Sequence, residues 1–157
     1  MPTPENLQPI ATVVAALVGG GFVLYVDRRN AYRVASVKFR AAVLAALSGL
    51  YPHPANWPRN VRSIDEVLRR AFPALQASVD EFRSFVPRDR QPAFDQAWRI
   101  YRLGKDGREC DVQDYWQYIP HNLSGIAVNG RSVERDNRLT YKEDFKRNVD
   151  RLLSFSS

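Results

Sequence analysis

Residues 7–26, LQPIATVVAALVGGGFVLYV, contain no charged residue, whereas the sequence that follows them is strongly charged. A helix rises about 1.5 Å per residue, so a helix over this stretch would cover about 30 Å, the thickness of a bilayer's hydrocarbon core. Three successive glycines weaken a soluble helix, but lipid tolerates them because only an intact hydrogen-bond ladder satisfies the backbone there. The pattern predicts a single transmembrane helix over residues 7–26, after a short extended tail over residues 1–6.

Two other interpretations of this apolar stretch stay open. A cleaved signal peptide would need a basic segment before the stretch and a cleavage site of small residues after it. Only Glu5 carries charge before the stretch, and FVLYVDRR closes it without such a site, so this interpretation fits poorly. A buried helix of a soluble core is the second interpretation, because the stretch is short and rich in Ala and Gly.

The charges on either side of the apolar stretch predict its orientation. No Lys or Arg precedes the stretch, and it is followed closely by five cations: Arg28, Arg29, Arg33, Lys38 and Arg40. The positive-inside rule places these cations in the cytoplasm, where they are candidates for contact with anionic lipid. We therefore expect a bacterial inner-membrane protein with its N-terminus outside and a cytoplasmic domain over residues 27–157.

Small residues spaced four apart recur within the apolar stretch, namely Ala15, Ala16, Gly19 and Gly20. Such spacing lets two helix backbones approach closely in lipid. This face is the candidate packing surface for a homo-oligomer or for a membrane-protein partner.

Apolar residues at helical spacing continue beyond the stretch, and no Pro or Gly occurs between Phe22 and Ser48. One face is predicted to be buried: Val34, Val37, Ala41, Leu44, Leu47 and Tyr51. Arg33, Lys38 and Arg40 are expected on the opposite face. We therefore predict that the transmembrane helix continues unbroken to about Leu50.

Further helices are indicated by their start and stop signals. Capping boxes at Ser63–Glu66 and Thr140–Glu143 predict two helix starts. Pro73 is expected to break or kink the first of these helices, and Pro92 to open another one. Asn129-Gly130 predicts a small hairpin near residues 126–133, or only a loop. The sequence thus predicts a mostly α domain of four or five helices, with the long helix as one member.

The charge of the predicted domain is strongly positive. All 23 Lys and Arg of the chain fall in residues 27–157 with 16 of its 17 acidic residues, since only Glu5 lies outside, which gives about +7. A basic domain beside anionic lipid gains attraction. The cations do not cluster with interleaved aromatic residues, so nucleic-acid binding is not expected. The single cysteine, Cys110, fits a reducing compartment.

The sequence contains none of the common catalytic or phosphate-binding motifs, and its two histidines lack neighbouring ligands at metal-site spacing. We expect neither a metal nor a cofactor. The richest polar and aromatic segment, residues 109–122, ECDVQDYWQYIPHN, offers a candidate pocket or interface: Asp111, Asp114, Tyr115, Tyr118 and His121. The simpler interpretation is that the two tyrosines fill the core and Asp111 caps a short helix.

The segments FRAAVLAALSGLYP, LQASVDEFRSFVP and FKRNVDRLLSF resemble parts of uncharacterised small bacterial proteins. Those proteins have a hydrophobic N-terminal segment followed by a compact helical part. The resemblance covers most of the chain and implies a bacterial inner-membrane setting, but it implies no activity, substrate or site.

Three functions are compatible with these patterns. The favoured one is a single-pass inner-membrane protein whose basic helical domain is a protein-interaction or scaffolding module. The first alternative is a module that binds anionic lipid or a phosphorylated ligand at the membrane surface. The second is a membrane-associated enzyme using His121 with Asp111 or Asp114. The pattern leaves enzymatic activity open and favours a non-enzymatic role.

Overall fold

A computed structural model describes residues 8–58, 61–105, 107, 109, 113–122, 126–128, 131–133 and 136–157; side chains are excluded at 8–26, 61–63, 126–128 and 131–133. The described chain is mostly helical, as predicted. Its four α-helices are α1 (Gln8–Ala46), α2 (Val61–Arg83), α3 (Gln91–Leu103) and α4 (Tyr141–Leu153). Two single turns of 3-10 helix complete it, η2 (Trp116–Tyr118) and η3 (Ser154–Ser156).

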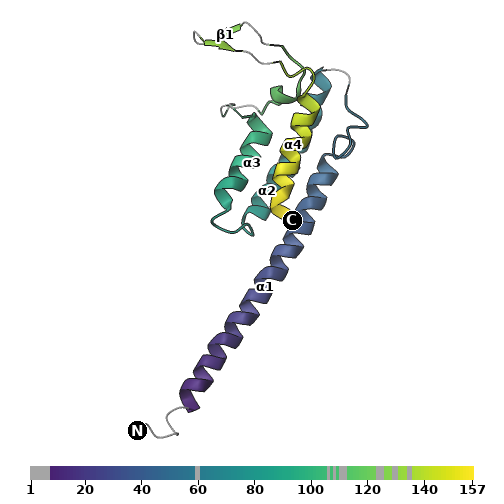
Figure 1. Ribbon diagram of the computed structural model, residues 1–157. Coiled ribbons are helices and arrows are strands. Elements are labelled where there is room, and N and C mark those ends of the chain that lie inside the picture. Colours follow the sequence, from purple (N-terminus) through teal and green to yellow (C-terminus); the bar gives the residue numbers. More distant parts are fainter. Residues whose placement is uncertain are drawn as a thin grey trace.

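Helix α1 is one unbroken helix of 39 residues, so the predicted continuation out of the apolar stretch is confirmed. Its C-terminal half packs in the bundle with α2, and its N-terminal half extends away from the other helices (Figure 1). The helix ends at Ala46, slightly before the predicted end, and a turn over residues 47–50 follows. Gly49 has a φ of +82° there, a conformation that residues with a Cβ rarely adopt.

The predicted transmembrane stretch coincides with the N-terminal half of α1. The side chains there, including the small residues Ala15, Ala16, Gly19 and Gly20, lie outside the described residues. Among the described residues, no helix combines the length and the apolar character needed to cross a membrane. The tail over residues 1–6 also lies outside the described residues, and the membrane span remains a prediction.

The buried face of α1 differs from the predicted one. Val34 and Val37, expected in the core, are 69% and 71% exposed. The described buried residues of α1 are Ser36, Phe39 and Val43, and the burial continues in the following turn with Leu50 and with Leu47, which was predicted to be buried. Phe39 decides the orientation, because its ring stacks on Phe82 of α2 with 4.5 Å between centroids and buries more apolar surface than a valine can.

Helix α2 continues through Pro73, so the predicted break is wrong. The proline costs the hydrogen bond that its missing N–H would have donated to the carbonyl of Arg69. The ring itself is exposed, and the buried stripe runs past it on both sides: Ile64, Leu68, Leu75, Val79 and Phe82. Packing of this stripe against the bundle holds the helix together across the proline.

A small antiparallel ladder joins β1 (Ile126–Val128) to β2 (Arg131–Val133), with Ile126 opposite Val133. The strands flank Asn129-Gly130, the pair that predicts a hairpin turn, and these two residues lie outside the described chain. The ladder is at the end of the bundle remote from the N-terminal half of α1 (Figure 1).

Aromatic rings form the centre of the bundle. At the end nearer the N-terminal half of α1, Phe94 lies edge-on to Phe155, with 5.3 Å between ring centroids. The hydroxyl of Tyr32 donates a hydrogen bond to the carbonyl of Phe155, which fixes η3 against α1. Towards the other end, Trp57 lies edge-on over Phe145, with 5.3 Å between ring centroids.

Candidate functional site

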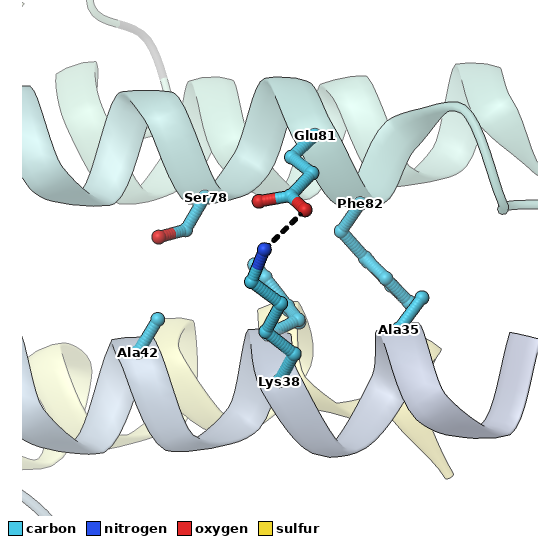
Figure 2. Close-up of a pocket in the computed structure, with 7 residues that line it drawn as sticks. Ala35, Lys38, Ala42, Ser78, Glu81 and Phe82 are labelled. Atoms are coloured by element: carbon cyan, nitrogen blue, oxygen red, sulfur yellow. Dashed lines mark hydrogen bonds and ion pairs between the residues drawn. The ribbon is translucent and has the colours of Figure 1, made fainter.

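A small groove between α1 and α2 results directly from the stacked phenylalanines. Lys38 precedes Phe39 and Glu81 precedes Phe82, so the stack brings the charged pair together at the surface. Lys38 Nζ lies 2.6 Å from Glu81 Oε1 across the groove (Figure 2). The groove is lined by Ala35, Lys38, Phe39, Ala42, Ser78, Glu81 and Phe82.

The groove is too small for a metabolite. Its volume is about 40 Å³, enough for a few waters, whereas ligand pockets usually measure about 300–1,000 Å³. Both charged side chains are more than half exposed, so their ion pair contributes about 0–1 kcal/mol. The groove is therefore a feature of helix packing, and Lys38 is paired with Glu81 across it.

Tyr115 and Tyr118, two of the predicted pocket residues, are fully buried in the core. The Tyr118 hydroxyl donates to the carbonyl of Tyr101 at 2.9 Å and accepts from the Asn148 amide at 3.1 Å. Burial raises the pKa of both tyrosines far above the usual range. Both phenols therefore stay protonated well above neutral pH.

Asp114 and His121 bind the backbone rather than each other in the contacts described. Asp114 Oδ1 accepts from the N–H of Trp116 at 2.9 Å and so caps η2, the role predicted for Asp111. His121 Nδ1 lies 2.9 Å from the carbonyl oxygen of Ile119, which can only accept. Asp111 lies outside the described residues.

Nothing in the described part of the chain gathers three or more His, Cys, Asp or Glu at metal-binding distance. His121 also serves the fold through its backbone, whose N–H donates to Asn137 Oδ1 at 2.7 Å. Asn137 returns two bonds, from Nδ2 to the carbonyls of Gln117 and Ile119. These contacts fix the chain around η2, and the ring that remains accessible there is Trp116, which is 59% exposed.

All five cations predicted to follow the apolar stretch are exposed on α1. Arg28 and Arg29 lie before the first residue that packs on the core, whereas Arg33, Lys38 and Arg40 lie alongside the bundle. Arg40 is close enough to Asp150 to act on it. Burial raises the pKa of Asp150, but the hydrogen bonds from Lys146 and Tyr51 together with the charges of Lys146 and Arg40 lower the pKa overall.

The sequence patterns did not identify the exposed valines of the described side chains on α1, Val34 and Val37. Their helical spacing resembles that of core residues, and only the packing of Phe39 shows that they face outward. The cations that flank them, Arg33, Lys38 and Arg40, are evident in the sequence, where they are predicted to contact anionic lipid.

Comparison with known proteins identifies no relative: no family model, no curated protein and no solved structure matches this chain.

Proposed function

We propose that this protein is a single-pass inner-membrane protein whose basic helical domain is a protein-interaction or scaffolding module. The observation that carries the proposal is the continuity of α1 from Gln8 to Ala46. One helix joins the uncharged stretch over residues 7–26 to the core of the bundle. Such a helix would hold the domain at a set distance and orientation from the bilayer.

Further support comes from what the described surface offers. The described groove is too small for a metabolite, the buried tyrosines are structural, and α1 exposes both cations and apolar side chains. These are the features of a binding surface rather than of a catalytic site. The N-terminus would lie outside and the domain in the cytoplasm, following the charge difference across the stretch.

Alkaline carbonate extraction of membranes tests the anchor. The full chain should remain in the membrane pellet, and Leu17→Arg should shift it substantially to the supernatant, because an arginine at mid-membrane costs about 2.5–3.5 kcal/mol. Leu139→Arg is the matched control, since Leu139 is 90% exposed in a turn of the domain. Complete extraction of the unaltered chain would end the proposal.

Thiol labelling tests the orientation. In a Cys110→Ser background, Leu139→Cys provides a single exposed thiol in the domain. A membrane-impermeant maleimide should label it only after the cells are lysed. Labelling of intact spheroplasts to the same extent would place the domain outside and reverse the orientation.

The second candidate function is recognition of anionic lipid, favoured by the exposure of Arg28 and Arg29 next to the apolar stretch. Both would lie within about 5 Å of the hydrocarbon boundary, at the level of the headgroups. Arg28→Glu with Arg29→Glu should then weaken binding to vesicles rich in phosphatidylglycerol and reduce its salt dependence. The same change at Arg69 and Arg70, on α2, serves as the control.

A further inference from the structure

Helix α1 carries an apolar face that is largely exposed. Val34 and Val37 are 69% and 71% exposed, Ala41 is exposed and Leu44 is half-buried. We call these four residues the docking face. They follow one another at intervals of three, four and three residues, which places them in one line along the helix. The buried face with Phe39 is on the opposite side, so most of this line points away from the bundle.

Cations border the docking face on both sides. Helical spacing puts Arg33 and Arg40 along one edge and Lys38 along the other. Lys38 is paired with Glu81, whereas Arg33 has no carboxylate partner among the described residues. The docking face is thus an apolar line with the exposed arginines Arg33 and Arg40 along one edge, about three helical turns long with its flanks.

We infer that the docking face binds an amphipathic helix of a partner protein, one whose apolar residues recur at heptad spacing and whose flanking residues are Asp and Glu. Apolar residues of such a helix would cover Val34 and Val37, and its carboxylates would lie beside Arg33 and Arg40. The inference rests on the proposed function, since it names the kind of partner that the interaction module takes.

A second copy of this chain fits the docking face poorly. In a parallel pair of α1 helices, Arg33 of one copy would face Lys38 of the other, a cation that already pairs with Glu81 of its own chain. In an antiparallel pair, the edge with Arg33 and Arg40 would face itself. Like charges in these positions oppose pairing, whereas an acidic helix has the complementary charge.

Lipid also fits the docking face poorly, because of its height above the bilayer. If the hydrocarbon region ends at Val26, the rise of the helix puts Val34 about 12 Å and Ala41 about 22 Å beyond it. The headgroup layer of one leaflet is about 5–8 Å thick. Arg28 and Arg29 lie within that layer, and the docking face lies in the cytoplasm above it.

Synthetic helices test the inference on the full chain in detergent micelles. The probe is a labelled peptide about three heptads long, with Leu at its apolar positions and Glu at the flanking ones. A second peptide carries Lys in place of Glu. Fluorescence anisotropy should show binding of the acidic peptide and at least about tenfold weaker binding of the basic one.

Two variants locate the binding. Val34→Ser with Val37→Ser should weaken binding of the acidic peptide at least about tenfold. Arg33→Glu with Arg40→Glu should make the chain bind the basic peptide more tightly than the acidic one. Val67→Ser, an exposed valine on α2, and Arg88→Glu, an exposed arginine in a turn, are the matched controls and should change neither affinity appreciably. Helical circular dichroism confirms that all four variants fold.

Three outcomes would overturn the inference. The first is equal binding of both peptides, or binding that the double variants leave unchanged. The second is a dimer of the unaltered chain in sedimentation that Val34→Ser with Val37→Ser dissociates, which would assign the face to a second copy. The third is a loss of vesicle binding, without any effect on peptide binding, in that same variant. None of these outcomes affects the result of carbonate extraction, so the proposed membrane anchor and the proposed docking face are tested independently.

Discussion

At the scale of single residues, the buried tyrosines show how polar groups are built into the core. Tyr101, Tyr115 and Tyr118 come from α3 and from the segment around η2, and all three rings are buried. Tyr118 makes two hydrogen bonds through its hydroxyl, whereas the hydroxyls of Tyr101 and Tyr115 have no partner among the described residues. The phenol hydroxyl of Tyr118 thus links two elements of the fold, whereas the hydroxyls of Tyr101 and Tyr115 are buried without a described partner.

Replacement of single hydroxyls should separate these two situations. Tyr118→Phe leaves the Asn148 amide and the Tyr101 carbonyl without this partner, and the free energy of unfolding should fall by about 1–3 kcal/mol. Tyr115→Phe removes a hydroxyl that lacks a described partner, so stability should stay the same or rise slightly. Chemical denaturation of the full chain in detergent measures both. Equal losses in the two variants would contradict the difference.

At the scale of elements, two apolar faces of α1 compete for the contact with α2. The helix has apolar residues on two faces, and only one of them can face α2. Phe39 stacks on Phe82 and lies 6.0 Å edge-on to Phe94, so three rings from three helices meet on its side. The valines on the other face are thereby left exposed.

Truncation of one residue on each face should reveal this asymmetry. Phe39→Ala removes a buried ring and should lower the free energy of unfolding by about 3–5 kcal/mol. Val37→Ala, on the docking face, should change it by no more than about 0.5 kcal/mol. Thermal unfolding followed by circular dichroism gives both values. A comparable loss for Val37→Ala would mean that the described face is covered.

Much of this architecture could be predicted from sequence, because it depends on local signals. The unbroken α1, the last helix starting after Thr140 and the strands around Asn129-Gly130 all follow from residues within a few positions of each other. The orientation of α1 could not be predicted, since it depends on Phe82, which lies 43 positions beyond Phe39. The continuation of α2 through Pro73 could not be predicted either, because it depends on packing of the α2 stripe against other helices.

The candidate site residues also divide into those that local sequence signals predict and those that depend on distant contacts. Cations on α1 were visible in the sequence because exposure is the default for arginine. The roles of Tyr115 and Tyr118 were visible only as alternatives, since an aromatic residue beside Asp suits a pocket and a core equally. Burial decides between these alternatives, and burial is set by contacts with Tyr101 and Asn148 from other elements.

At the scale of the whole molecule, stability should depend on pH through the tyrosines. Burial raises the pKa of Tyr51 to about 12, helped by its hydrogen bond to Asp150, and raises the pKa of the three core tyrosines further. Unfolded tyrosine titrates near 10. A pKa that is higher in the folded state gives stability that is complete below pH about 10 and lost as the pH rises towards the folded values.

Unfolding free energy should therefore decline steadily above pH about 10. Each core tyrosine that keeps its proton in the folded state but loses it on unfolding contributes at most about 1.4 kcal/mol per pH unit to this slope. Tyr115→Phe should reduce the slope by about that amount. Denaturation series at several alkaline pH values, with tyrosinate absorbance recorded in parallel, measure the effect; an unchanged slope would show that Tyr115 titrates normally in the folded protein.

The bond between Tyr32 and Phe155 has a consequence for anything attached after Ser157. It brings the end of η3 to the level at which α1 leaves the bundle (Figure 1). In the proposed orientation, Tyr32 is only about 9 Å beyond the hydrocarbon region. A fused domain of about 100 residues has a radius of gyration near 13 Å, so a short linker would press it against the headgroups or pull Phe155 out of the core. Fluorescent or affinity fusions at this end therefore need a linker long enough to clear the bilayer surface.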